Sequence, residues 1–271
     1  MTAAAALPGP ALLFCPADRP DRYAKALAAA DVVVLDLEDG VGAAGKEAAR
    51  AALVATAVDP ARVVVRVNAA GTPEHAADLE ALHGTAYRMI MLPKAERRDQ
   101  LDALAGWQVV ALCETPQGIL AAAELAAAPN VIALMWGAED LIASLRGRTS
   151  RLPDGRYRGV ALHARASVLL AAAACGRPAI DAIYTNIGDL DGLAAEAEDA
   201  AASGFALKAC IHPTQVPVVR KAFRADPAQV AWARRVLAAV RDGGAIAVDG
   251  QMIDAPLIRQ AESILASVND Y

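Results

Sequence analysis

Apolar and polar positions divide the chain into two kinds of segment that alternate along its length. Short runs rich in Val, Ile and Leu are followed by longer Ala-rich segments of helical character. Near-continuous apolar runs predict strands that are covered on both faces, as in a parallel sheet. The expected strands cover residues 11–17, 32–39, 62–69, 88–95, 108–115, 131–140, 179–187 and 205–213.

Eight strands separated by helices in a chain of 271 residues predict a TIM (β/α)8 barrel, an α/β fold. A doubly wound open sheet is the rival architecture, but no G-x-G-x-x-G motif follows the first expected strand. The helices are expected at 20–30, 46–57, 73–84, 96–106, 190–204 and 217–223, with an Ala-rich helix between the fifth and sixth strands.

Two segments exceed a minimal barrel. Residues 141–158 form a long arginine-rich connection, whose arginines can bind phosphates, simply solvate a loop or join subunits. We expect residues 1–227 to form the catalytic barrel and residues 228–271 to form a helical extension, with Gly243 and Gly244 as a hinge. The extension has no barrel strand left to supply, so we expect it to act as a lid or to contact a neighbouring subunit.

Composition limits the class of protein. The chain is 56% hydrophobic and 21% charged, which is typical of a globular fold, and its net charge of −5 argues against nucleic acid as a main partner. The four cysteines lack paired spacing, which favours free thiols over disulfides or zinc. The first residues lack the positive region of a signal peptide, and no uninterrupted apolar run could span a membrane, so we expect a cytoplasmic protein with no membrane partner.

Polar side chains gather at the carboxyl ends of the expected strands, where a TIM barrel carries its active site. The opposite ends offer mainly Ala, Val and Ile. This asymmetry indicates an enzyme. The polar set is Asp36, Glu38, Asp39, Arg66, Asn68, Lys94, Glu114, Glu139, Asp140, Asn186, Lys208 and His212.

Glu114 and Asp140 close the fifth and sixth apolar runs. If those strands are parallel neighbours, both carboxylates reach the same edge of the sheet. Oxygen ligands without nearby His or Cys select Mg²⁺, Mn²⁺ or Ca²⁺ over zinc, and Mg²⁺ commonly takes one or two carboxylates and keeps waters. We expect a metal site here. The alternative is that each acid caps a helix or pairs with an arginine.

Arg66 lies late in an apolar strand, where a guanidinium must be paired or face a polar cavity. It can polarise a carbonyl and stabilise an oxyanion, and it can also pair with Asp36 or Glu38, which share one face of the second strand. Those two acids can instead order metal-bound waters. Lys94 can attract a substrate anion or can remain a solvated lysine.

The motifs LFCPADRP, VVVLDLEDGV, VVRVN, MLPKAE, ETPQG, MWGAEDL, CIHPTQV and VDGQMIDAPL occur in this order. Together they resemble the citrate lyase β-subunit-like proteins, most closely the stand-alone bacterial type. This group belongs to the HpcH/HpaI aldolase superfamily and is related to malyl-CoA and citramalyl-CoA lyases. The resemblance covers about residues 11–268.

The resemblance implies a Mg²⁺-dependent lyase, with Mn²⁺ as a possible substitute, that works as a trimer or hexamer. The expected reaction cleaves or forms a carbon–carbon bond in a 3-hydroxyacyl-CoA such as citramalyl-, malyl- or hydroxymethylglutaryl-CoA. The products are an acetyl-CoA-type thioester and a keto acid. By resemblance Glu114 and Asp140 bind the metal, Arg66 contacts the substrate, and the lid residue Asp254 serves the active site of a neighbouring subunit.

Three questions stay open at the level of sequence. Asp254 could instead cap the helix that follows it, since Asp suits that position and Pro256 suits a first turn. The same scaffold could act as an acyl-CoA thioesterase. It could also be a citrate lyase subunit that depends on its complex and acts on acyl-carrier-protein thioesters.

Overall fold

The computed structural model describes residues 7–241, 246–248 and 250–269. Contacts divide the chain into two compact units, Met1–Val219 and Arg220–Tyr271. The expected hinge glycines, Gly243 and Gly244, lie outside the described residues. No helix among those residues is long and apolar enough to cross a membrane.

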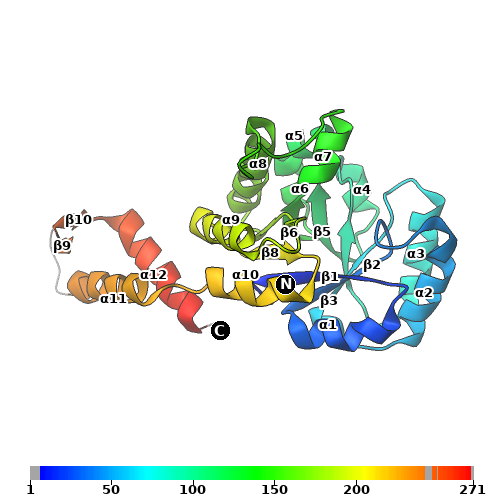
Figure 1. Ribbon diagram of the computed structural model, residues 1–271, viewed down its shortest axis with the longest axis horizontal. Coiled ribbons are helices and arrows are strands. Elements are labelled where there is room, and N and C mark those ends of the chain that lie inside the picture. The colour runs from blue at the N-terminus through cyan, green and yellow to red at the C-terminus, as the bar shows by residue number, and fades with distance from the viewer. Residues whose placement is uncertain (1–6, 242–245, 249, 270–271) are drawn as a thin grey trace. The chain divides into compact units, whose positions relative to one another are not determined.

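The first unit is a closed barrel of eight strands, each parallel to its neighbours, with β8 pairing back onto β1 (Figure 1). The TIM-barrel prediction is confirmed. The strands are β1 (Ala11–Pro16), β2 (Val32–Asp36), β3 (Val63–Arg66), β4 (Met89–Leu92), β5 (Gln108–Cys113), β6 (Val131–Trp136), β7 (Ala179–Asp181) and β8 (Leu207–Cys210).

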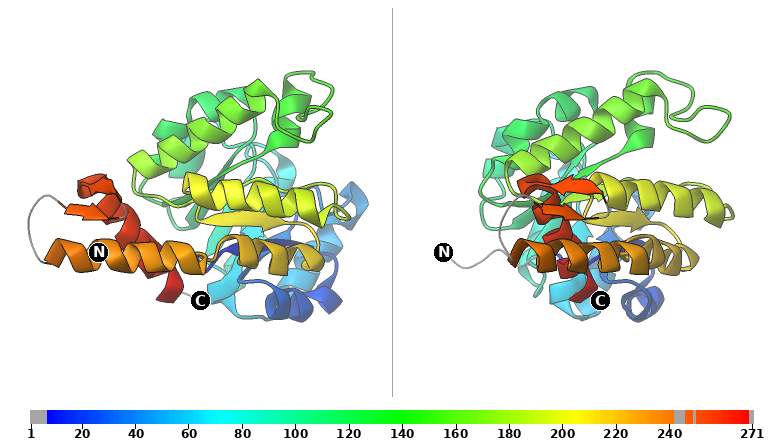
Figure 2. Two further views of the ribbon diagram at one scale, coloured as in Figure 1. Left: turned by 60° about the vertical axis from the view of Figure 1, so that its left-hand side comes forward. Right: turned by 90° about the vertical axis from the view of Figure 1, so that its left-hand side faces the viewer.

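Helices surround this barrel on the outside (Figure 2). Local caps set several helix starts: the Thr72 and Thr115 side chains accept backbone N–H bonds ahead of a proline in the first turn, and Asp189 caps a third helix. The helices are α1 (Tyr23–Ala29), α2 (Lys46–Ala55), α3 (Pro73–His83), α4 (Arg98–Asp102), α5 (Pro116–Leu120), α6 (Ala122–Ala126), α7 (Ala138–Ser144), α8 (Gly159–Ala174), α9 (Leu190–Ser203) and α10 (Val216–Ala222).

Several expected strands are too long, including those over 32–39, 179–187 and 205–213, which end at Asp36, Asp181 and Cys210. The sixth strand matters most for the site. The sequence suggested a strand over residues 131–140, but β6 ends at Trp136 and α7 begins at Ala138. The sequence does not show this boundary clearly, because α7 begins without a side-chain cap and so lacks the usual signal for a helix start. Asp140 therefore lies in the first turn of a helix and not at the end of a strand.

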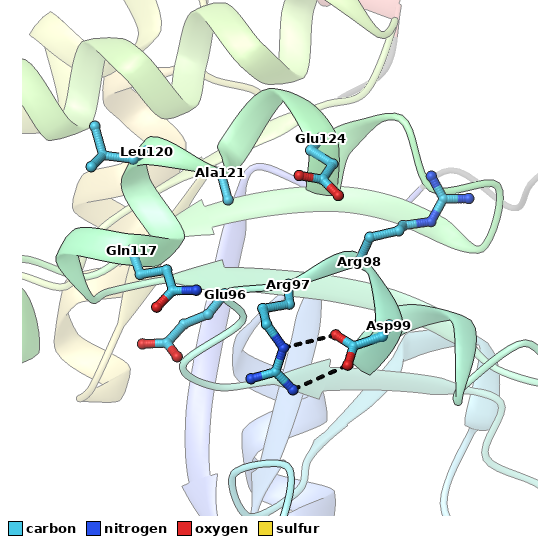
Figure 3. A pocket seen from close by; sticks show the side chains of 8 residues that line it. All are labelled: Glu96, Arg97, Arg98, Asp99, Gln117, Leu120, Ala121 and Glu124. Atoms are coloured by element: carbon cyan, nitrogen blue, oxygen red, sulfur yellow. Dashed lines mark hydrogen bonds and ion pairs between the residues drawn. The ribbon is translucent and has the colours of Figure 1, made fainter.

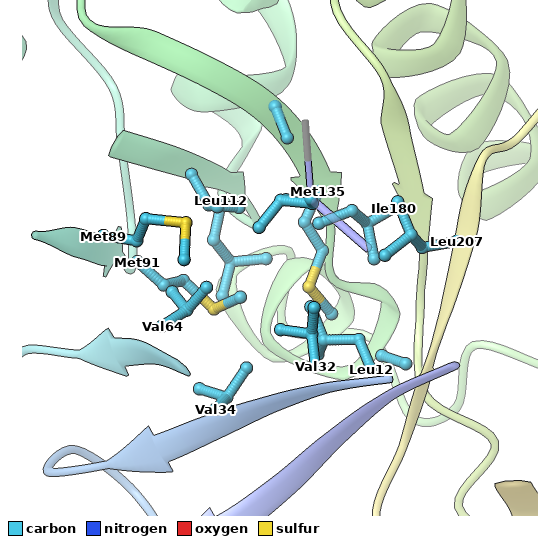
Figure 4. Close-up of a cluster of buried hydrophobic side chains, with 14 of the residues drawn as sticks. Leu12, Val32, Val34, Val64, Met89, Met91, Leu112, Met135, Ile180 and Leu207 are labelled. Carbon is cyan, nitrogen blue, oxygen red and sulfur yellow. The ribbon is translucent and has the colours of Figure 1, made fainter. Parts of the chain in front are cut away.

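Strand alternation fills the barrel interior with apolar side chains (Figure 4). Each fully buried Val, Leu or Met side chain stabilises the fold by roughly 1.5–3 kcal/mol. In several strands the side chain two residues after the last interior position points in the same direction as the interior side chains. It lies at the carboxyl end of the barrel, here called the barrel mouth. The interior cluster includes Leu12, Val34, Val64, Met91, Leu112, Met135, Ile180 and Leu207.

The second unit is a small helical unit with a two-stranded antiparallel sheet. It comprises α11 (Pro227–Arg241), β9 (Ile246–Val248), β10 (Gln251–Ile253) and α12 (Ala255–Asn269). Its buried core includes Ala233, Val236, Val248, Ile253 and Ala261. Asp254 is exposed and its Oδ1 accepts the backbone N–H of Leu257 at 3.3 Å, which is the capping contact that the sequence allowed.

Candidate metal and substrate site at the barrel mouth

Arg66 and Asp36 form the base of the site. They are register partners on β3 and β2, and both lie two residues beyond interior valines. Arg66 Nε and Nη2 donate to Asp36 Oδ1 and Oδ2, each at 2.7 Å. Asp36 also accepts the backbone N–H groups of Glu38 and Gly40. A Cβ on Gly40 would overlap the Asp36 carboxylate, so this turn requires glycine.

Glu38 joins Arg66 to Lys94. Its Oε2 lies 2.9 Å from Arg66 Nη1, and its Oε1 accepts from Lys94 Nζ at 2.6 Å. Burial alone would lower the pKa of Arg66, but the carboxylates of Asp36, Glu38 and Glu114 raise that pKa above its usual range. Arg66 therefore remains a fixed positive charge, packed over the Phe14 ring at 5.0 Å.

Glu114 follows β5 and is 3% exposed. Burial, followed by the negative charges of Asp140 and Glu38, raises the pKa of Glu114 from 4.5 to about 8, against the opposing effect of Lys94 and Arg66. Its Oε1 accepts the Lys94 backbone N–H at 3.1 Å. A Cβ on Gly137 would lie 2.8 Å from Glu114 Cβ and 2.9 Å from Oε2, so glycine at this point makes room for the carboxylate.

The acidic side chains converge on one point. Lys94 Nζ lies 3.9 Å from Glu114 Oε1, 3.7 Å from Asp140 Oδ1 and 2.6 Å from Glu38 Oε1. Lys94 itself has a left-handed backbone, with φ of 50°, which is uncommon for a residue other than glycine. A single cation thus reaches all three carboxylates.

This donor set fits Mg²⁺. Glu114 and Asp140 are hard oxygen donors. Burial and, after it, the neighbouring negative charges of Asp140 and Glu38 raise the pKa of Glu114, and a divalent cation would offset both effects. Within the described residues, no group of three or more His, Cys, Asp or Glu side chains is placed to hold a metal ion. Two carboxylates with open positions for water and substrate match the usual coordination of Mg²⁺ in enzymes.

Some of the expected mouth residues do not join this cluster. Lys208 lies between the inward-facing Leu207 and Ala209, so its side chain points out of the barrel, where it is fully buried against Asp181. Asn186 and His212 are exposed, and His212 Nδ1 bonds Thr214. The expectation that a position near the end of a strand places a side chain at the mouth is wrong for Lys208. Side chains alternate between the two faces of a strand, and Lys208 lies on the outward face of β8.

A surface pocket lies between α4 and the α5–α6 segment (Figure 3). Arg97 pairs with Asp99 at 2.9 Å and Arg98 pairs with Asp102 at 2.8 Å, as solvent-facing side chains do. None of the residues expected to act on substrate or metal lines it. The lining is Glu96, Arg97, Arg98, Asp99, Gln117, Leu120, Ala121 and Glu124.

Residues 11–213 match the family described as HpcH/HpaI aldolase/citrate lyase, which is most of the barrel. The chain belongs to this family. A "citrate lyase subunit beta-like protein" of Mycobacterium tuberculosis is 59% identical over 258 residues, which cover 95% of this chain and 94% of that protein.

Two more distant relatives have different activities in their names. A "(3S)-malyl-CoA thioesterase" of Cereibacter sphaeroides is 35% identical over 272 residues, covering 94% of this chain and 93% of that protein. The mitochondrial "citramalyl-CoA lyase" of Homo sapiens is 32% identical over 267 residues, covering 86% of this chain and 77% of that protein. The family thus contains both lyases and thioesterases.

A crystal structure of the Mycobacterium tuberculosis protein CitE was solved in complex with magnesium, acetoacetate and coenzyme A. It superimposes with a TM-score of 0.94 at 58% identity, covering 97% of this chain and 98% of that one. A further structure of Mycobacterium tuberculosis CitE contains magnesium and pyruvate, with a TM-score of 0.85 at 53% identity, covering 95% of this chain and 98% of that one. A structure of a citrate lyase beta subunit from Mycobacterium tuberculosis contains oxaloacetate and magnesium, with a TM-score of 0.80 at 60% identity, covering 80% of this chain and 98% of that one.

Proposed function

We propose that this protein is a Mg²⁺-dependent lyase that cleaves or forms a carbon–carbon bond in a 3-hydroxyacyl-CoA. Candidate substrates are citramalyl-, malyl- and hydroxymethylglutaryl-CoA, and the products are an acetyl-CoA-type thioester and a keto acid. The convergence of Glu114 and Asp140 on one point beside the charged Arg66 carries this proposal. The magnesium and coenzyme A in the structure of the similar CitE protein support it.

Glu114 and Asp140 would hold the metal. Bound there, Mg²⁺ would supply a Lewis acid for the substrate oxygens and a template that orients them; Mn²⁺ is a possible substitute. In the cleavage direction the 3-hydroxyl loses its proton and the bond between C2 and C3 breaks. The electron pair moves onto the thioester carbonyl to give an enolate, and the enolate carbon takes up one proton.

Arg66 would stabilise the negative charge that develops on the thioester oxygen. Its guanidinium is already held by Asp36 on two bonds and lies beside Glu38, so it need not reorganise when the charge forms. Glu38, Asp36 and Lys94 would line the substrate side of the site. Lys94, at 36% side-chain exposure, is open enough to meet a substrate anion.

Asp254 is proposed to move the proton. We propose that the extension over residues 228–271 is a lid and that Asp254 acts in a neighbouring subunit of a cytoplasmic trimer or hexamer. Its contact with the Leu257 backbone is compatible with this proposal, because a capping carboxylate keeps a second oxygen. Mixing Asp254→Asn with Glu114→Ala protein tests it: mixed oligomers should recover part of the activity that each variant lacks.

The second candidate is hydrolysis of the thioester by water on the same scaffold. The 35% identity to a (3S)-malyl-CoA thioesterase favours it. A dependent subunit acting on acyl-carrier-protein thioesters is the third, and activity of the isolated protein on CoA esters would exclude it.

A product assay separates the first two candidates. Each 3-hydroxyacyl-CoA is incubated with the protein, with and without Mg²⁺, and the free keto acid and free thiol are measured. A keto acid without thiol supports the lyase, and thiol without keto acid overturns it. Asp140→Ala serves as the control, since it should abolish Mg²⁺-dependent turnover while the barrel stays folded.

A further inference from the structure

A second ionic cluster lies on the outside of the barrel, between the sheet and its helices. Lys208 Nζ donates to Asp181 Oδ2 and to Glu196 Oε1, both at 2.9 Å. Lys208 and Asp181 are fully buried, and Arg165 adds a bond to Asp181 at 2.9 Å. Breaking such buried pairs is costly, so this cluster is a rigid anchor.

Arg151 connects the long loop after α7 to this anchor. Its Nη1 donates to Glu196 Oε2 at 2.6 Å and its Nη2 donates to the Tyr157 hydroxyl at 2.8 Å. Its guanidinium lies 4.0 Å from the Tyr157 ring centre and 4.7 Å from that of Tyr184. Arg151 and Tyr157 also form an antiparallel backbone bridge. A single arginine thereby fixes the two sides of the loop.

The segment that carries Asp140 is held at both ends, at its start directly by this cluster and at its end by Ser150, the residue before Arg151. Before it, the Trp136 indole N–H donates to Asp181 Oδ1 at 2.7 Å. After it, the Ser150 hydroxyl, next to Arg151 and 1% exposed, donates to Glu139 Oε1 at 2.7 Å. Between these tethers, α7 is only seven residues long and has no side-chain cap at its start. A helix this short depends on tertiary contacts for its position.

We propose that Arg151 is a positioning residue for the metal site. It holds Ser150 against Glu139, which fixes the first turn of α7 and so keeps the Asp140 carboxylate opposite Glu114. This inference rests on the proposed assignment of Glu114 and Asp140 as metal ligands. Arg151 itself touches neither metal nor substrate. Partners outside the ligand shell commonly change metal affinity by about 10–100-fold when they are removed.

The test compares Arg151→Ala with Arg156→Ala. Both remove one positive charge from the same loop, but Arg156 is exposed and pairs only locally with Asp154, at 2.7 Å. Arg151→Ala should still fold, because Glu196 keeps its bonds to Lys208 and to the Tyr157 hydroxyl. The measurement is the Mg²⁺ dissociation constant by calorimetry, without substrate, well below the unfolding temperature.

The sign of the effect separates positioning from charge. Loss of a positive charge near a cation site should favour Mg²⁺ binding slightly in both variants. Loss of positioning should weaken Mg²⁺ binding about 10-fold in Arg151→Ala alone. Hydrogen exchange of the α7 amides should also accelerate in Arg151→Ala and stay unchanged in Arg156→Ala. Ser150→Ala, which removes only the bond to Glu139, should reproduce part of both effects.

The outcomes distinguish this inference from the proposed metal site. Equal Mg²⁺ affinity in Arg151→Ala and the parent overturns the positioning inference, provided that Glu114→Gln abolishes Mg²⁺ binding. If Glu114→Gln binds Mg²⁺ as the parent does, the metal assignment is wrong and the inference falls with it. Equal weakening of Mg²⁺ binding in Arg151→Ala and Arg156→Ala would also overturn the positioning inference, because the contact of Arg151 with the ionic cluster would then have no effect on Mg²⁺ binding.

Discussion

Replacing Glu114 with glutamine is expected to stabilise the protein in the absence of metal, although it removes a proposed metal ligand. Because the folded protein raises the pKa of Glu114 from 4.5 to about 8, it binds this proton more tightly than the unfolded chain does. The free energy of unfolding therefore falls as pH rises through that window and levels off above about pH 8. At about 1.4 kcal/mol per pH unit, the loss accumulated by pH 7 is about 3 kcal/mol.

Glutamine at position 114 has no charge to desolvate and can still accept the Lys94 backbone N–H. Urea unfolding with a chelator, at pH values between 5 and 8, should show Glu114→Gln and the parent converging at the acid end. At pH 7 the variant should be more stable by an amount on the order of 3 kcal/mol. Adding Mg²⁺ should stabilise the parent alone, since bound ligand adds to folded-state stability.

The exposed Glu124→Gln, on α6, controls for the substitution itself and should match the parent at every pH. A stability difference between Glu114→Gln and the parent that does not change with pH would refute the argument. It would mean that Glu114 does not experience the burial and negative charge that surround it in this structure.

Three further predictions concern other parts of the molecule. Arg66→Lys keeps the charge but loses the planar fork that holds Asp36, so kcat should fall by roughly 10²-fold or more. An effect on KM alone would show that Arg66 binds the ground state and the transition state equally. Asp254→Asn should leave thermal stability unchanged, because Asn caps a helix about as well as Asp does, but it should lower lyase turnover by roughly 10²–10⁴-fold. If the variant keeps full turnover, Asp254 is a helix cap and does not transfer the proton. Lys208→Met removes one of the cations that neutralise the buried Asp181 carboxylate, so the free energy of unfolding in urea should fall by about 3–5 kcal/mol. An unchanged free energy of unfolding would show that Arg165 alone neutralises the Asp181 charge.

The sequence was sufficient for the barrel and for the inward-facing part of the site. Alternation with a period of two places Asp36 and Arg66 on the faces of Val34 and Val64, and the structure has this arrangement. The same rule, applied to β8, would have turned Lys208 outward between Leu207 and Ala209. A position near the end of a strand does not by itself tell on which face of the strand the side chain lies.

Other features depend on contacts between residues far apart in the chain. The bonds from Trp136 to Asp181 and from Arg151 to Glu196 each join segments 45 residues apart, and no local pattern marks them. The glycine that precedes α7, Gly137, makes room for the Glu114 side chain. This contact between distant parts of the chain cannot be predicted from the local sequence, so the start of α7 is not predicted either. Its lack of a side-chain cap also removed the usual sequence signal for a helix start.

The two faces of this sheet carry unlike ionic clusters, with Asp36 and Arg66 inside and Asp181 and Lys208 outside. Insertion or deletion of a single codon within β2, β3, β7 or β8 would exchange inward and outward side chains beyond that point and bury charges without partners. Changes of two codons would preserve the faces but shift the height of every group along the barrel. Length variation among descendants of this chain should therefore collect outside the strands. The spacing of two residues from Val34 to Asp36, from Val64 to Arg66 and from Leu112 to Glu114 should stay fixed.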